Sequence, residues 1–448
     1  MKILKPGTKY WKLGNDMQSL LNKPLSKNVK RATAIAGLLL FLSGLPLTLG
    51  FFCMILILVA EGDSEAIQVG LGGFTLITIM LGAGGIILWH SLRSLQGKPS
   101  NSLSLPSVWV MAGLFGICVA VGLFITESNF AAGLLFPPLL LVGAAVPPLL
   151  AISWFTAQKA GGLTWRWGLV ALAGGATLGV LVALILEIIL PLIVLSLVLN
   201  LAEMMTASFE DLLIALTGEN IALALTEPGF IFLLVHLAVI APLAEELAKP
   251  LVTLPLVGRL SRRDAFLVGA IAGAGFAALE NVLYAGFGFY FWAGILVVRA
   301  LGGAIHPLGS GLVALGWRSV LQNEPGAWLN WLARFGLAVG VHALWNGSSL
   351  LIITLAGAKF FGQLPPEINI LGLSMAGMTL ALLIILGVTA LWAGRSIVQN
   401  VELDISENRE SAKLDFIVSD RSIAIWAMIC LVAIVPVGIT GLQLLFRL

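Results

Sequence analysis

The sequence predicts an all-α polytopic membrane protein, and three observations carry this prediction. Of its 448 residues, 59% are hydrophobic and only 11% are charged, and the mean hydropathy is +1.01. Apolar runs of about twenty residues, long enough to cross a bilayer as helices, occur about eleven times. Fifty glycines suit helices that pack closely through small side chains. A soluble core does not need this much apolar surface.

The expected spans follow directly from these apolar runs. They lie at approximately 33–60, 66–90, 106–126, 131–155, 167–198, 229–258, 264–286, 288–316, 332–357, 370–394 and 424–446. Basic residues precede the first span and then occupy alternate loops, as at Arg93, Lys159 and Arg318. The intervening loops are mostly acidic, as at Glu61 and Glu127. The charge pattern therefore predicts a cytoplasmic N-terminus and an external C-terminus.

The chain divides into five predicted regions by composition. We expect a basic cytoplasmic segment, a membrane bundle with no assigned role, an interfacial amphipathic helix, a core with buried charges, and a two-span segment with a polar loop. Their respective limits are 1–32, 33–200, 201–226, 227–357 and 358–448.

Ionisable residues inside a predicted span are the strongest functional signal. Glu245, Glu246 and Lys249 lie within five residues of one span, and such groups are costly in lipid unless they have partners or water. Lys249 follows the two glutamates at i+4 and i+3, so its ammonium can reach either carboxylate. Pro242 and Pro250 bracket the motif and loosen the helix there. A structural ion pair or a proton relay is the alternative reading.

Further polar residues occupy the next three spans. Glu280, His306 and His342, like Glu245, lie between about 15 and 24 Å from the predicted cytoplasmic ends, at about 1.5 Å per residue. All four therefore lie well inside a core about 30 Å thick. We therefore expect them to converge.

The residues that neighbour Glu280, His306 and His342 are compatible with more than one function. Arg299 lies seven residues before His306 on one helix face, and it can pair with Glu280 simply to hold helices together. Asn346 is one turn beyond His342, so the two can stabilise an oxyanion or hold a metal ion. Glu187 is expected to be a partner for a basic group or a water site. A single histidine in a span can also be a hydrogen-bonded core residue.

Three familiar types of intramembrane active site are excluded. Every aspartate lies in a loop or at the edge of a span, so no pair of buried aspartates exists. There is no His-Glu-x-x-His motif. Leu308 precedes Gly309-Ser310-Gly311, so the Gly-x-Ser-Gly element is absent. Any chemistry in this bundle must use glutamates and histidines.

Four motifs in successive spans resemble the PrsW-type intramembrane proteases. They are Glu-Glu-x-x-Lys, Phe-x-x-x-Glu-Asn, an arginine with a downstream His-Pro, and His-x-x-Trp-Asn, within roughly residues 228–350. They are more distantly similar to the CAAX-prenyl endopeptidases and their ABI relatives. Compared with that second pattern, a lysine replaces a more distant arginine, and Glu280 stands where a histidine is expected.

The resemblance implies an intramembrane endopeptidase that acts on membrane proteins in a bacterial plasma membrane. Its partners would be the lipid bilayer and a membrane-protein substrate, with no nucleic acid. The implied active-site residues are Glu245, Glu246, Glu280, His306 and His342. The implied supporting residues are Lys249, Phe276, Asn281, Arg299 and Asn346.

Two mechanisms remain open at this point. In one, a carboxylate of the Glu245–Glu246 pair is a general base, and His342 with Asn346 or Arg299 holds the oxyanion. In the other, a zinc ion is bound by Glu280, His306 and His342. A proton-coupled secondary transporter and a non-catalytic membrane scaffold are the alternative functions.

Overall fold

The computed structural model describes most of the chain and confirms an all-α polytopic membrane protein. Eight of the described helices are long and apolar enough to cross a membrane, or nine if one bent helix pair counts as a single span. The predicted interfacial helix at 201–226 and the last predicted span at 424–446 lie outside the described residues. These are 26–62, 64–125, 129–157, 159–198, 228–287, 292–360 and 366–407.

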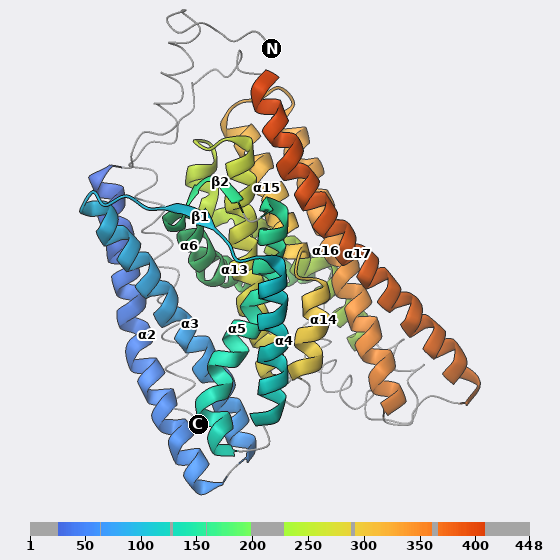
Figure 1. The fold of residues 1–448 in the computed structure, drawn as a ribbon. Coiled ribbons are helices and arrows are strands. Elements are labelled where there is room, and N and C mark those ends of the chain that lie inside the picture. The colour runs from blue at the N-terminus through green and yellow to red at the C-terminus, as the bar shows by residue number, and fades with distance from the viewer. Residues whose placement is uncertain are drawn as a thin grey trace, which may run out of the picture.

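Helices α2 (Lys27–Glu61) and α3 (Ser64–Leu95) form an antiparallel hairpin along one side of the molecule (Figure 1). Glycines let the two backbones approach: a methyl group on Gly37 would collide with the backbone of Leu88. Helix α2 runs without interruption through Pro46 and ends at Gly62, whose φ of 76° is the left-handed conformation that glycine favours.

The next elements connect this hairpin to the centre of the bundle. Helices α4 (Val108–Ile125) and α5 (Asn129–Thr156) pack against each other. A short antiparallel strand pair, β1 (Ser102–Ser104) with β2 (Lys159–Thr164), is an addition to the predicted all-α fold. The predicted span at 167–198 is α6 (Trp165–Gly174), the π-helical turn η1 (Gly175–Gly179) and α7 (Val180–Val198).

The span with the double glutamate is irregular on both sides of its motif, as its prolines predicted. Pro242 has no N–H and its ring clashes with the carbonyl four residues earlier, and a π-helical turn precedes it. Beyond the motif, Pro250 lies in a 3₁₀ turn. The elements are α10 (Pro228–Val235), η2 (His236–Ile240), α11 (Ala241–Ala248), η3 (Lys249–Thr253) and α12 (Leu254–Val257).

The remaining helices are mostly long. They are α13 (Arg262–Phe287), α14 (Trp292–Leu301), α15 (Ile305–Leu321), α16 (Ala327–Phe360) and α17 (Pro366–Glu407). The predicted continuous span at 288–316 is instead α14 and α15, with a bend of 44° between them. Gly302 and Gly303 lie at the break, and the Trp345 ring fills the space where a side chain at Gly302 would be.

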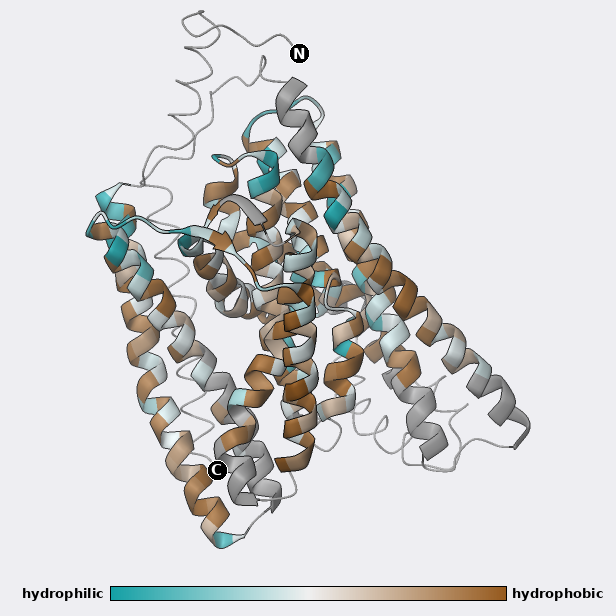
Figure 2. Cartoon of the chain, viewed as in Figure 1, coloured by the Kyte–Doolittle hydropathy of each residue, from teal (hydrophilic) through white to brown (hydrophobic). Residues whose placement is uncertain are grey.

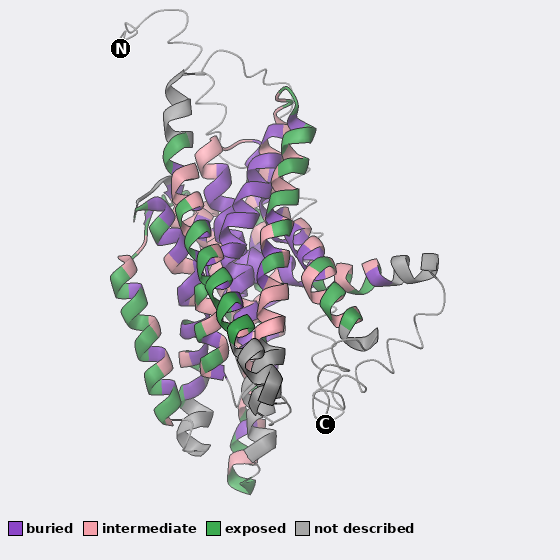
Figure 3. Ribbon diagram, turned by 90° about the vertical axis from the view of Figure 1, so that its right-hand side faces the viewer, coloured by how far each residue is buried: buried purple, intermediate pink, exposed green. Residues whose placement is uncertain are grey.

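Helix α13 is the centre of the bundle. In the most apolar 18-residue stretch of α13, 83% of the residues are buried, against 17% in the corresponding stretch of α2. The buried residues gather in the middle of the molecule (Figure 3). The outer helices consist largely of hydrophobic residues (Figure 2), and several of these, such as Leu49 on α2 and Ile385 on α17, are exposed. Methyl groups on Gly175 or Gly275 would collide with the backbones of Ala272 or Leu172. As the small residues predicted, neighbouring backbones touch α13 directly and fix its position.

Candidate active site

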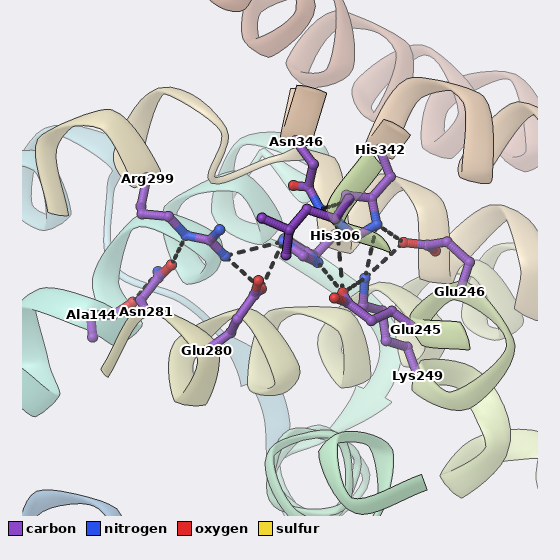
Figure 4. A network of polar contacts seen from close by, with 11 residues as sticks. Ala144, Glu245, Glu246, Lys249, Glu280, Asn281, Arg299, His306, His342 and Asn346 are labelled. Atoms are coloured by element: carbon purple, nitrogen blue, oxygen red, sulfur yellow. Dashed lines mark hydrogen bonds and ion pairs between the residues drawn. The ribbon is translucent and has the colours of Figure 1, made fainter. Parts of the chain in front are cut away.

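The structure brings the predicted buried residues together in one cluster (Figure 4). Glu245, Glu246 and Lys249 come from the α11–η3 segment, and Glu280 and Asn281 come from α13. Arg299, His306 and His342 come from α14, α15 and α16 in turn. Glu246, Lys249 and His342 are completely inaccessible to solvent, and Glu245, Glu280 and His306 are also buried. The expected convergence of four spans is confirmed.

Lys249 contacts both glutamates of its own motif, as the spacing predicted. Its Nζ lies 2.8 Å from Glu246 Oε1 as a hydrogen bond. It also lies 2.9 Å from Glu245 Oε2, an ion pair without hydrogen-bond alignment, since this oxygen has no hydrogen-bond partner. The ammonium lies over the Phe276 ring, 4.6 Å from its centroid. This cation compensates two buried carboxylates that would otherwise be unstable there.

Each histidine of the cluster has one nitrogen on a carboxylate. His342 Nδ1 lies 3.0 Å from Glu246 Oε1, and His306 Nε2 lies 3.1 Å from Glu280 Oε2. An ionised carboxylate can only accept hydrogen bonds, so we assign the proton of each ring to the nitrogen that faces it. The opposite nitrogens, His342 Nε2 and His306 Nδ1, then carry free lone pairs.

Arg299 fixes the second of these carboxylates. Its Nη2 donates to Glu280 Oε2 at 2.5 Å, and its Nε donates to Asn281 Oδ1 at 2.6 Å. Asn281 in turn donates to the carbonyl of Ala144 on α5 at 2.9 Å. The guanidinium lies over the Tyr284 ring, 4.8 Å from its centroid. The Glu280–Arg299 pair that the sequence suggested is therefore present, within a larger network.

Three atoms without hydrogen-bond partners meet at the centre of the cluster. They are Glu245 Oε2, His306 Nδ1 and His342 Nε2, all buried. Glu245 Oε2 lies 3.8 Å from His306 Nδ1 and 3.7 Å from His342 Nε2. One ligand atom from each residue lies within 4.8 Å of the others. Buried ring nitrogens are seldom left unpaired in this way, and the Lys249 ammonium, 2.9 Å from Glu245 Oε2, is the cation that balances this oxygen.

This geometry fits a divalent metal ion. Two imidazole nitrogens and one carboxylate oxygen are a donor set of catalytic zinc sites, and neighbouring ligands of a tetrahedral ion lie roughly 3.4 Å apart. The other nitrogen of each histidine is held by a carboxylate, as is usual for metal-bound histidines. The cluster also contains three carboxylates but only the two cations Lys249 and Arg299. A divalent cation bound there would offset that excess of buried negative charge.

The free donor atoms differ from the ligand set that the sequence suggested. Glu280 was expected with His306 and His342, but among the described residues the ligand atoms that lie within 4.8 Å of one another come from Glu245, His306 and His342. Glu280 Oε2 is held by Arg299 and by the protonated nitrogen of His306. Glu245 instead directs an oxygen at the free nitrogens of both histidines. The geometry therefore favours Glu245, rather than Glu280, as the third ligand of a metal ion.

Asn346 lies one turn from His342, but its side chain forms a hydrogen bond to the backbone of another helical segment. Its Nδ2 donates to the carbonyl of Leu237 at 2.9 Å, inside the π-helical turn that precedes the double glutamate. Such turns leave carbonyls without their usual helical partners. Asn346 thus connects α16 to the start of the motif and supports its position.

Two features of the site had no clear sequence signal. A methyl group on Gly309 would lie 2.5 Å from Glu246 Oε2, so this glycine makes room for the carboxylate. The carbonyl of Ala144, which accepts a hydrogen bond from Asn281, lies on a helix without charged residues. Gly309 lies three residues beyond His306 on the same helix face, and only this spacing could have indicated from the sequence that Gly309 lies at the site.

The other candidate residues lie outside the central contacts. Glu187 on α7 is partly buried and close enough for electrostatic interaction with Glu280 and Lys249. His236 lies in η2, where its ring stacks on Phe232 at 5.9 Å. We assign neither residue to the cluster.

Comparison with known proteins relates part of the chain to a family. Residues 163–373 match the family model described as PrsW family intramembrane metalloprotease. No curated protein and no solved structure matches the chain. The matched segment extends beyond the predicted core of 227–357 at both ends and contains all the side chains of the cluster. Residues 163–373 of this integral membrane protein therefore belong to the PrsW family of intramembrane metalloproteases.

Proposed function

We propose that this protein is a zinc-dependent endopeptidase that hydrolyses peptide bonds of membrane proteins within the bilayer. The observation that carries the proposal is the meeting of Glu245 Oε2, His306 Nδ1 and His342 Nε2, three buried ligand atoms without hydrogen-bond partners. The family match supports proteolysis, and three protein ligands leave one position open for water or substrate. A bound zinc ion would lower the pKa of water and polarise the scissile carbonyl.

Glu280 is the proton acceptor in this proposal. Its Oε2 is held by Arg299 and His306, whereas its Oε1 has no hydrogen-bond partner. Glu246 also has an unpartnered oxygen, but Gly309 packs against it so closely that a single added methyl would lie 2.5 Å away. Glu280 therefore takes the proton of the attacking water at Oε1 and delivers it to the leaving amine nitrogen.

The other residues position these groups. Glu246 and Glu280 accept the N–H groups of His342 and His306, and so hold both rings with their free nitrogens inward. Lys249 balances the charge of the two neighbouring glutamates. Arg299 holds Glu280 through its guanidinium.

The proposal is tested with the full-length protein purified and returned to lipid. Cleavage of a panel of single-span membrane proteins is compared for the wild type, Glu280→Gln and His236→Gln, with and without a zinc chelator. We expect wild type and the His236→Gln control to cleave, to lose activity with chelator and to regain it with added zinc. We expect Glu280→Gln to bind zinc but to cleave about 10²–10⁴ times more slowly.

Cleavage by zinc-free protein that the chelator leaves unchanged would contradict the metal-dependent mechanism and favour a metal-free glutamate protease. Unchanged cleavage by Glu280→Gln would remove Glu280 from the reaction.

A further inference from the structure

A second polar site lies at the predicted cytoplasmic end of the bundle, where the end of α3 meets the start of α6. A cavity of about 180 Å³ opens there, and its lining includes His90, Arg93, Ser100, Trp165 and Arg166. None of these residues belongs to the active-site cluster. The family match begins at residue 163, so the cavity joins this segment to the preceding helices.

The cavity carries positive charge, and none of the described residues that line it carries a carboxylate. Arg166 interacts electrostatically with Arg93, and His90 interacts with both arginines. Within the described part of the chain, neither arginine forms an ion pair with an acidic residue. Two like charges at one cavity repel each other, and a bound anion would remove that repulsion.

Hydrogen bonds hold the residues around this cavity in place, but some of their nitrogen atoms have no hydrogen-bond partner. Arg166 Nη2 donates to the carbonyl of Lys98 at 2.7 Å, and the Arg166 backbone N–H donates to Ser100 Oγ at 3.1 Å. The Trp165 N–H donates to the carbonyl of Asn101 at 3.0 Å. These bonds hold the loop after α3 against the start of α6. Arg166 Nε and His90 Nδ1 remain buried without a hydrogen-bond partner.

The surroundings of the cavity suit a membrane lipid. Trp89 and Leu92 on the adjacent turn of α3 are 60% and 43% exposed, and the Arg93 guanidinium lies over the Trp89 ring at 5.7 Å. Exposed tryptophan beside arginine is typical of the membrane interface. A headgroup in the cavity would leave its acyl chains beside these apolar side chains.

We propose that this cavity binds the phosphate group of an anionic ligand, with an anionic phospholipid headgroup as the source that the surrounding surface favours. The planar donor fork of arginine matches phosphate oxygens, and basic pockets between spans on the cytoplasmic side bind acidic headgroups. A bound headgroup would connect α3 to α6 through Arg93 and Arg166.

The test measures binding of phosphatidylglycerol, labelled on its acyl chain, to the full-length protein in detergent micelles by fluorescence anisotropy. Phosphatidylcholine with the same label is the reference lipid. We expect tighter binding of phosphatidylglycerol, and a loss of affinity of roughly fivefold for each cation removed in Arg93→Gln and in the double variant with Arg166→Gln. Equal affinity of the double variant and the wild type for phosphatidylglycerol would overturn the proposal.

A matched control removes a cation elsewhere. Arg395 also lies over a tryptophan ring, that of Trp154 at 4.8 Å, but does not line the cavity. Arg395→Gln should keep wild-type affinity, and a loss equal to that of Arg93→Gln would show non-specific attraction and contradict the proposal. Because Arg166 anchors a loop, Arg93→Gln alone with an unchanged unfolding temperature keeps the test valid if the double variant misfolds.

Inorganic phosphate separates the two sources of the ligand. If phosphate does not displace phosphatidylglycerol from the wild type while Arg93→Gln weakens lipid binding, the ligand is a lipid headgroup. If phosphate displaces the lipid and its effect is lost in Arg93→Gln, the same site takes soluble phosphate compounds.

Discussion

The two halves of the candidate active-site cluster contain the same kinds of group but have different surroundings. Each contains a histidine, a carboxylate that holds it and a cation that balances the carboxylate. In the closed triad of Glu246, Lys249 and His342, every side chain is completely inaccessible to solvent. In the open triad of Glu280, Arg299 and His306, the side chains of Glu280 and Arg299 retain 9% and 12% exposure.

This difference in exposure bears on what each carboxylate can do. A sealed carboxylate can orient a histidine but cannot exchange a proton with a substrate. A carboxylate with an unpartnered oxygen and some remaining exposure can do both. Glu245 lies between the triads and contacts a histidine of each. We therefore expect Glu280 of the open triad to be needed for the reaction itself, and substitutions in the closed triad to act only through folding and metal affinity.

The largest expected effect is on the reaction rate. Glu280→Gln keeps the size and hydrogen-bond acceptor of the side chain but removes its capacity to take a proton. Cleavage at saturating zinc should fall about 10²–10⁴-fold, and because the partly buried Arg299 loses its charged partner, the free energy of unfolding should also fall. Kinetics of peptide cleavage in lipid measure the first quantity, and chemical unfolding in micelles measures the second. A rate that excess zinc restores would contradict a role in proton transfer.

The next effect is on stability. Lys249→Met leaves Glu245 and Glu246 buried without their cation, and the free energy of unfolding should fall by about 3–5 kcal/mol. Arg299→Met is the matched change in the open triad. It should cost less, because its carboxylate partner is not sealed. Equal losses in the two variants would show that the difference in exposure has no energetic meaning.

Substitutions in the closed triad should also lower the affinity of the protein for zinc. In Glu246→Gln the His342 ring loses its charged acceptor, so zinc affinity should decrease about 10–100-fold. Competition with a chelator of known affinity measures this change. Because the proton acceptor is intact, cleavage should return when zinc is raised, unlike in Glu280→Gln. Failure of zinc to restore cleavage would place Glu246 in the reaction itself.

A single methyl group probes how tightly the closed triad is packed. Gly309→Ala would place its methyl 2.5 Å from Glu246 Oε2 and should cost about 1–2 kcal/mol in unfolding free energy. Gly340→Ala on α16 is the control, since an added methyl there meets no atom within 4 Å. A neutral Gly309→Ala would mean that Glu246 has room to move.

The smallest effect concerns an ion pair outside the spans. Burial alone would raise the pKa of Glu324, but a hydrogen bond from Ser319 and the charges of Arg318 and Arg262 lower it. A lowered pKa in the folded state means stability that is present above the unfolded pKa of 4.5 and lost as pH falls through the folded pKa. Glu324 Oε1 lies 2.7 Å from Arg318 Nη1 and is partly exposed.

For that reason the contribution of Glu324 should be below about 1 kcal/mol. It is measured as the difference in unfolding free energy between wild type and Glu324→Gln from about pH 6 to about pH 3. The difference should shrink as pH falls. A difference that grows on acidification would reverse the sign of the pKa shift.

Hydropathy and charge predicted most of the fold and which buried polar residues come together in one cluster. Charged side chains are so costly in lipid that Glu245, Glu246, Glu280 and Lys249 had to find partners, and their spacing fixed the Lys249 contacts. The break at Gly302–Gly303 was not predicted, because an apolar run reads the same whether it is straight or bent. The β1–β2 pair was also missed, since its short strands are distant in sequence.

The choice between Glu245 and Glu280 as the third metal ligand could not be made from sequence. Both carboxylates were expected at similar depth, and neighbouring side chains on a helix such as Glu245 and Glu246 point about 100° apart. Which of them faces the histidines depends on helix rotation and on the position of Arg299. Those are set by packing against α13, through contacts such as that of Asn281 with Ala144.

The most direct test of this account is the zinc content of the purified full-length protein and of two single variants. The wild type should contain about one zinc ion per chain. At saturating zinc, Glu280→Gln should retain it and Glu245→Gln should lose it. Zinc retained in Glu245→Gln and lost in Glu280→Gln would contradict the ligand assignment, and an active wild type without zinc would contradict the metal-dependent mechanism.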